Sequence, residues 1–355
     1  EEATRNRKKH DGFLVTLTTL QKIKEVVFSM GTKRKALRRV LDGRVVTLLI
    51  LTALLNVALT LLLPGTFLSG SNFSGIFTSL TFDLLLSCGM TVVLILGGVD
   101  LSVGSVVALV GITTSTLVKN GFPLVPTILI GLVIGAAVGC INGFLVAKIG
   151  LAPFIATLGM NAIVRGSCYV LTSGYLISGL PESFTNLSRL TVLGVPMMVI
   201  ISLACAAIMA FCLFKFSVFK QMYLIGTSPV TAVLSGIPAV RLKIIGYGIS
   251  GLFAALTGIL MSSRYGMGFA GYAVGFESRA IAAAVIGGAV MAGGEGNMVG
   301  TLMGVILVAI VNNAFIMLNG PAEAQYAISG VMLITALILD RVKGMKKKKV
   351  KKEGA

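Results

Sequence analysis

Ionisable side chains inside long apolar stretches are the residues of this sequence whose chemistry stands out. Asp83 and Arg165 each lie within a run of mostly apolar residues. A charge at the centre of a bilayer costs roughly 2.5–3.5 kcal/mol on insertion scales, so it persists where it is paired, hydrated or functional. We expect an interhelical pair, a polar lining or direct contact with a passing solute, and whether the two side chains meet stays open.

Two further acids lie in glycine-rich turns, Asp100 in G-G-V-D-L-S-V-G and Glu295 in G-G-E-G-N. Because a carboxylate before a helix accepts hydrogen bonds from free backbone N–H groups, we favour helix capping for both. Glu277 and Arg279 fall near the outer end of a predicted span, where exposure, mutual contact and contact with a binding protein stay open. The polar positions with a predicted pathway or structural role are Asp83, Asp100, Asn142, Arg165, Glu277, Glu295, Asn312 and Asn313.

Several kinds of chemistry are excluded by residue type. His10 is the only histidine, which argues against a histidine-dependent triad or zinc site. The cysteines lie in apolar stretches and are odd in number, so they indicate small buried side chains rather than disulfides. No G-x-x-x-x-G-K-[ST] phosphate loop occurs, so any ATP must be hydrolysed by a partner. We therefore expect no catalytic residue, metal or cofactor.

Composition indicates which structural elements must position these residues. The 355-residue chain is 55% hydrophobic and only 12% charged, which a water-soluble fold cannot accommodate. A spanning helix needs about 20 mostly apolar residues, and by this criterion the sequence has about ten candidates. We therefore predict an all-α fold, a polytopic bundle of transmembrane helices. The eighth is short and glycine-interrupted, which predicts a half-helix or re-entrant segment. The candidates are residues 45–63, 76–96, 102–118, 125–147, 153–174, 196–214, 242–261, 279–293, 298–318 and 326–341.

The positive charge is concentrated at the two ends of the chain. Twelve of the 30 Lys and Arg precede Val45 and eight follow Asp340, a pattern typical of cytosolic flanks. We divide the chain into a basic cytosolic arm (1–44), a transmembrane domain (45–341) and a basic cytosolic tail (342–355). The first span follows a long basic arm and is expected to be retained rather than cleaved as a signal peptide. With an even number of spans, one set of internal basic residues also falls inside: Lys148, Lys215, Lys220, Arg241 and Lys243.

Basic tails also occur in nucleic-acid-binding proteins, but nothing between these tails resembles a nucleic-acid fold, so we expect a lipid bilayer and no nucleic acid. Three function classes remain: the membrane subunit of an ATP-driven transporter, an ion-coupled secondary transporter and a membrane scaffold.

The predicted cytosolic loop 215–243 favours the first class. Ser228 and Pro229 suit a helix N-cap followed by the first helical position, and Gly236 suits its end. The result is a short surface helix whose small residues, Thr231, Ala232, Ser235 and Gly236, would fit a groove on another protein. A plain connecting loop is the alternative.

Residues 226–243 resemble the cytoplasmic coupling segment of ribose-type sugar permeases of bacterial ABC importers. Further motifs agree in order, from L-G-G-V-D-L-S-V-G-S (96–105) through N-G-F-L-V-A-K (142–148) and P-F-I-A-T-L-G (153–159) to E-S-R-A-I-A-A-A-V-I-G-G (277–288). The resemblance covers about residues 45–341. Ser228, Val230 and Thr231 depart from a pattern with Asn, an acid and Ala, and Pro238 with Ala239 stand for Asn and Val.

This resemblance implies a non-enzymatic permease subunit in the bacterial inner membrane, carrying a monosaccharide such as ribose. The implied partners are cytosolic ABC ATPase subunits, an extracytoplasmic sugar-binding protein and a second permease copy, identical or paralogous. The alternatives are a nucleoside or other small-solute permease of this family and, less favoured, an ion-coupled secondary transporter. No aromatic sugar platform stands out in the spans. The implied ATPase-coupling positions are Gly226, Ser228, Pro229, Thr231, Ala232, Ser235, Gly236 and Ile237.

Overall fold

A computed structural model describes residues 43–192, 194–318, 320–321, 324–325 and 327–338. The predicted basic arm and tail therefore lie outside the described residues, apart from residues 43–44. The chain divides into two units, Glu1–Thr47 and Leu48–Ala355. Of the first, the structure describes only the start of helix α2, so the rest of the fold belongs to the second.

Every one of the predicted apolar segments contains a helix, and seven of these helices are long and apolar enough to cross a membrane. They are α2 (Gly43–Leu62), α3 (Gly70–Ile95), α5 (Leu124–Phe144) with the π-helix η1 (Leu145–Ile149), α6 (Pro153–Thr172), α8 (Met197–Lys215), α11 (Ala239–Tyr265) and α13 (Met298–Met317).

The prediction of about ten spans with at least one short segment agrees with the structure, in which three segments form shorter helices. These are α4 (Val103–Lys119), α12 (Phe276–Ile286) and residues 327–338. The predicted half-helix is confirmed in α12, whose apolar run ends in the glycines that follow Ile286. Two helices also exceed the predicted segments, since α3 begins at Gly70 and α11 runs on to Tyr265.

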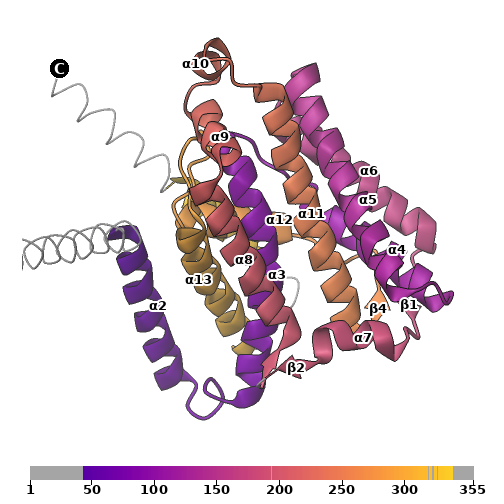
Figure 1. The fold of residues 1–355 in the computed structure, drawn as a ribbon. Coiled ribbons are helices and arrows are strands. Elements are labelled where there is room, and N and C mark those ends of the chain that lie inside the picture. The colour runs from indigo at the N-terminus through magenta and orange to yellow at the C-terminus, as the bar shows by residue number, and fades with distance from the viewer. Residues whose placement is uncertain (1–42, 193, 319, 322–323, 326, 339–355) are drawn as a thin grey trace, which may run out of the picture. The chain divides into compact units, whose positions relative to one another are not determined.

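Helices α3 and α11 form the centre of the bundle (Figure 1). In α3, 89% of the most apolar window is buried, against 22% in α5–η1 and in α6. The outer helices therefore present exposed leucine, isoleucine, valine and phenylalanine side chains, as expected of surfaces that face lipid.

The packing of α11 on α5 depends on small residues. A Cβ atom on Gly251 would collide with the carbonyl oxygen of Gly135, and one on Gly139 with that of Tyr247. Backbones in this contact lie closer than side chains permit, which is how helices associate in lipid. The glycine-rich composition is thus used at a helix crossing.

Shorter elements lie at the two ends of the bundle. At one end, here called the α10 end, are α9 (Ser217–Thr227) and α10 (Pro229–Leu234) (Figure 1). At the other, the α7 end, are α7 (Glu182–Arg189) and two antiparallel strand pairs, β1 (Ile177–Ser178) with β4 (Met267–Gly268) and β2 (Thr191–Val192) with β3 (Val195–Pro196).

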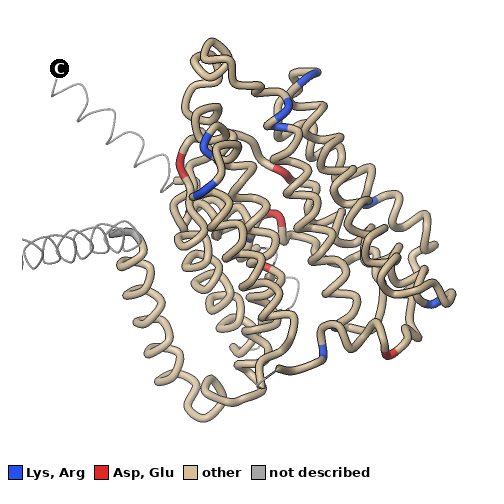
Figure 2. Tube along the Cα trace, in the orientation of Figure 1, with Lys and Arg blue, Asp and Glu red and all other residues tan. Residues whose placement is uncertain are grey.

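Basic residues gather at the α10 end (Figure 2). The five internal residues predicted to share one side all belong to elements of this end: Lys148 in η1, Lys215 closing α8, Lys220 in α9, and Arg241 with Lys243 opening α11. Lys119, Arg189 and Arg264 lie in the last turns of helices that end at the α7 end. The grouping predicted for the five internal basic residues is therefore present in the fold.

Candidate functional site

The predicted surface helix of the 215–243 loop is α10. Ser228 is its N-cap and accepts a hydrogen bond from the backbone N–H of Thr231 at 3.4 Å, and Pro229 is the first helical residue. Gly236, with φ +78°, turns the chain after the last helical turn. In this left-handed conformation its N–H donates to the carbonyl of Val233 at 3.0 Å, so this helix and its end are confirmed.

The outward face of α10 differs from the prediction. Ala232 is buried, so it packs inward instead of lining a contact surface, whereas Thr231, Ser235 and Gly236 are exposed and Ile237 is half-buried. The exposed side chains include three large apolar ones, Val230, Val233 and Leu234, the last 83% exposed. Residues 230–233 are all small or apolar, so the sequence did not indicate which side of this helix would face outward.

Gly226 joins α9 to the end of α3 and to the loop before α13. A Cβ atom here would collide with the carbonyl oxygen of Ile95 and the backbone nitrogen of Gly294, which themselves hydrogen-bond at 2.9 Å. Tyr223, one turn earlier, donates its hydroxyl to the carbonyl of Gly296 at 2.7 Å. Burial raises the pKa of Tyr223 to about 12, so the hydroxyl keeps its proton at neutral pH.

Asp100 is the hub of a buried hydrogen-bond network. Its Oδ1 accepts from the backbone N–H and the hydroxyl of Ser102, at 3.0 and 2.7 Å, and its Oδ2 accepts from the Ser250 hydroxyl at 2.9 Å. Asn142 donates to the Ser102 hydroxyl at 2.8 Å and to Asp100 at 3.4 Å. Burial raises the pKa of Asp100, and the hydrogen bonds from Ser102 and Ser250 oppose that shift.

The capping prediction is wrong for Glu295, and for Asp100 it holds only in the hydrogen bond from the backbone N–H of Ser102, directly before α4. The N-cap of α4 is Ser102, and Asp100 instead links the α3–α4 connection to α5 and α11. The N-cap of α13 is Asn297, whose side chain accepts from the Gly300 N–H at 2.7 Å, while Glu295 is exposed. In each case the N-cap stands two residues later, and of the two only Asn297 makes a side-chain capping bond.

Asp83 pairs with Arg279 and not with Arg165. The Arg279 Nη2 lies 3.1 Å from Asp83 Oδ1, and both side chains are buried, which corrects the surface interpretation of Arg279. The guanidinium also lies 3.7 Å from the centre of the Phe276 ring. The pair joins α3 to the half-helix α12.

Arg165 instead orders the segment between α11 and α12. Its Nη1 donates to the carbonyls of Ala270 at 2.6 Å and Tyr272 at 2.7 Å. Glu277 is half-buried at the start of α12. The buried carboxylate of α3 and the half-buried guanidinium of α6 thus both hold residues 270–279.

The asparagines of α13 have separate surroundings. Asn313 donates to the side-chain oxygen of Asn72 at 2.6 Å, which ties α13 to the first turn of α3. Asn312 is 2% exposed, and neither atom of its amide is hydrogen-bonded to any residue that the structure describes.

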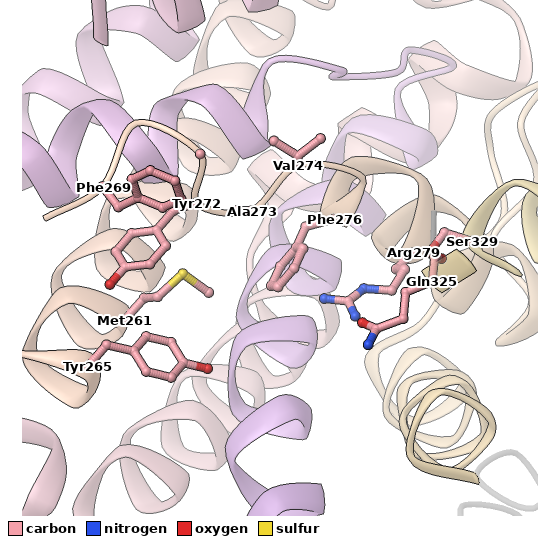
Figure 3. A pocket seen from close by; sticks show the side chains of 11 residues that line it. Met261, Tyr265, Phe269, Tyr272, Ala273, Val274, Phe276, Arg279, Gln325 and Ser329 are labelled. Carbon is pink, nitrogen blue, oxygen red and sulfur yellow. The ribbon is translucent and has the colours of Figure 1, made fainter. Parts of the chain in front are cut away.

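A cavity of about 340 Å³ opens beside the Asp83–Arg279 pair, on the Arg279 side (Figure 3). Tyr265, Phe269 and Tyr272 form one wall. The polar side chains of Arg279 and Gln325 lie opposite, and Phe276 lies between the two groups. Tyr272 donates to the Met267 carbonyl at 3.1 Å, and burial raises its pKa. The remaining lining residues are Met261, Gly271, Ala273, Val274 and Ser329.

This aromatic wall was missed from the sequence. Its residues lie at the end of α11 and in the connection to α12, outside the spans in which a platform was sought. The signal available was local density: Tyr265, Phe269, Tyr272 and Phe276 occur within twelve positions of a chain that is 7% aromatic.

Comparisons with known proteins agree with this architecture. The family described as "Branched-chain amino acid transport system / permease component" matches residues 72–337. A D-allose transport system permease of Escherichia coli K12 is 34% identical over 280 residues, which cover 79% of this chain and 86% of the relative. An L-arabinose transport system permease of the same strain is 33% identical over 303 residues, which cover 85% and 92%.

A ribose import permease of Bacillus subtilis 168 is 35% identical over 289 residues, which cover 81% of this chain and 90% of the relative. No solved structure gives a significant match. Because the family matches most of the chain and these relatives are matched over most of their length, the chain belongs to this family of ABC importer permeases, among its sugar permeases.

Proposed function

We propose that this chain is the membrane subunit through which a bacterial ABC importer moves a monosaccharide of the ribose, arabinose and allose type. The family match and the sugar permeases among the relatives support this function. Neither the nucleoside nor the ion-coupled alternative finds support among these relatives.

In this proposal the α10 end faces the cytosol and α10 docks on an ATPase subunit. The observation that carries the assignment is a capped six-residue helix with exposed Val230, Val233 and Leu234. Exposed apolar side chains outside the spanning helices favour a protein contact, and the surrounding basic residues favour the cytosolic side for this end. An extracytoplasmic binding protein delivers the sugar at the α7 end, and a second permease copy completes the pathway.

Coupling then runs from α10 through α9 to the Gly226 contact. ATP-driven closure of the ATPase would shift α9 against Ile95 of α3 and Gly294 before α13, two central elements of the bundle. The permease thereby alternates between two states biased by ATP.

The test is purification of the tagged chain from native membranes in mild detergent, with mass spectrometry of the proteins that stay bound. We expect an ATPase with phosphate-loop motifs, lost in Leu234→Asp and retained in Leu190→Asp, an exposed leucine directly after α7. Recovery of the chain alone under repeated gentle extraction, together with uptake driven by an ion gradient, would contradict the proposal and favour a secondary transporter.

A further inference from the structure

We propose that the cavity formed by residues 261–279 with Gln325 and Ser329 is a binding site for one neutral monosaccharide on the permease itself. The inference rests on the proposed function and adds to it, because selection of the sugar would then not be left to the separate binding protein alone.

Shape and lining favour a small amphipathic ligand. The volume of about 340 Å³ lies at the lower end of the ~300–1,000 Å³ typical of small-molecule sites. Tyr265 and Tyr272 have ring centres 5.8 Å apart, and Phe269 and Tyr272 are equally close. Such a wall offers ring faces to the C–H surface of a sugar, which is the apolar side of a polyol.

Charge compensation favours a neutral ligand over an anion. Arg279 lines the cavity, but Asp83 holds its guanidinium at 3.1 Å, so the two charges offset each other. A sugar phosphate or a carboxylate would have to compete with Asp83 for the same cation. A sugar hydroxyl needs only a donor, and an arginine keeps further N–H groups after pairing.

One such donor is present and unused. The Nε of Arg279 is buried and has no hydrogen-bond acceptor among the residues that the structure describes. Buried donors in proteins are nearly always satisfied, and this one belongs to a residue that lines the cavity, so a small rotation of the guanidinium would bring an unused donor to a ligand hydroxyl. Gln325 lies next to the guanidinium and adds an amide donor and an amide acceptor at the same wall (Figure 3).

Direct binding can be measured by fluorescence, because the sequence contains no tryptophan. Phe269→Trp places a single reporter in the wall, and Tyr175→Trp places one at a position that is 77% exposed and outside the cavity. The purified permease is titrated with ribose, arabinose, allose and ribose 5-phosphate. We expect a saturable change at position 269 with at least one neutral sugar, little with the phosphate, and none at position 175.

A flat response at position 269 to all three sugars, or an equal response at both reporters, would overturn the site. Stronger binding of ribose 5-phosphate than of ribose would also overturn it.

Transport kinetics separate this inference from the proposed function. In vesicles holding permease, ATPase and binding protein, Gln325→Ala should raise the KM for uptake about 3- to 10-fold, the loss of one hydrogen bond. Phe276→Leu should change the preference among the sugars, and Phe276→Tyr, which keeps the ring, should restore it. Tyr169→Leu, in the exposed face of α6, is the matched control and should behave as wild type.

Sugar-stimulated ATP hydrolysis should stay near wild type in Gln325→Ala, which shows that the complex assembles. If the wild type transports sugar but these variants keep its KM and its preference among the sugars, the binding site is refuted and the proposed function stands. If the wild type shows no ATP-dependent sugar uptake, the proposed function fails.

Discussion

Single charged residues in this protein hold an irregular connection between two helices in place. Asp83 and Arg165 lie in different helices, and each binds part of the segment between α11 and α12, the first through Arg279 and the second through the carbonyls of Ala270 and Tyr272. A buried charge is tolerated when a partner compensates its lost hydration. The segment that these charges hold is the one that carries the aromatic wall.

Removing one partner of the buried pair should be more harmful than removing both. Asp83→Ala leaves Arg279 uncompensated and should destabilise the protein by about 3–5 kcal/mol, whereas Asp83→Leu with Arg279→Met should recover most of that loss. Thermal unfolding in detergent checks the stability, with the exposed Glu182→Ala as control. Wild-type stability of Asp83→Ala would show that the pair is incidental.

The Asp100 network should respond to loss of its acceptor in the same way. Asp100→Leu removes the acceptor for Ser102 and Ser250 and leaves their buried hydroxyl donors unpaired, at a cost of about 1–3 kcal/mol for each group left unsatisfied. Asp100→Asn keeps an acceptor and should lose less. Equal loss in the two variants would contradict the network as the source of stability.

At the scale of elements, α9 and α10 form a unit defined by two glycines with different tasks. Gly226 is required because no side chain fits against Ile95 and Gly294. Gly236 has open space around it, but its φ of +78° is costly for any residue with a Cβ atom. Packing determines the first residue and backbone conformation determines the second.

Gly226→Val should weaken the joint between α9 and the bundle. The added side chain would force α9 away from α3, so we expect reduced thermal stability and loss of uptake. Gly166→Val is the matched control, since that helical glycine meets no atom within 4 Å. Similar behaviour of the two variants would mean that the close contact is not needed.

Gly236→Val should separate coupling from folding. Strain of about 1–2 kcal/mol should disturb the end of α10 while insertion and the spans stay intact. Uptake and ATPase co-purification should fall together, and Gly236→Asn, which tolerates the left-handed conformation, should retain more of both. Normal uptake in the valine variant would exclude a coupling role for the helix end.

For the whole molecule, the distribution of charge predicts which end meets the cytosol. The basic residues of η1, α8, α9 and α11 gather at the α10 end, and few lie at the α7 end (Figure 2). Positive residues flank spans on the cytosolic side, so the two ends should differ in access to reagents added outside the cell.

Labelling of single cysteines in a background without the five native ones tests this orientation. Tyr175→Cys, exposed at the α7 end, should react with a membrane-impermeant maleimide in spheroplasts, and Leu234→Cys only after lysis. Reaction of Leu234→Cys in intact spheroplasts would reverse the topology and place α10 out of reach of a cytosolic ATPase.

Features set by local sequence were predictable, and features set by distant partners were not. Apolar runs predicted the spans, and Ser228, Pro229 and Gly236 predicted α10, because capping and turn chemistry act over a few residues. The Asp83–Arg279 pair joins residues 196 positions apart, and the cavity gathers α11, α12 and residues 325–329. One sequence carries no measure of such distances, so Arg165 was as good a partner for Asp83 as Arg279.

The contact at Gly226 has a mechanical consequence. Backbone meets backbone there, so no side chain lies between α9 and Ile95 that could adjust to a displacement of α9. From Ile95 to Asp83 the path is one continuous helix, about 18 Å long at 1.5 Å per residue. Helix α3 thus connects the α9 contact at one end with the Asp83–Arg279 pair beside the aromatic wall at the other, so in the proposed mechanism a movement of α9 would reach the cavity along a single helix.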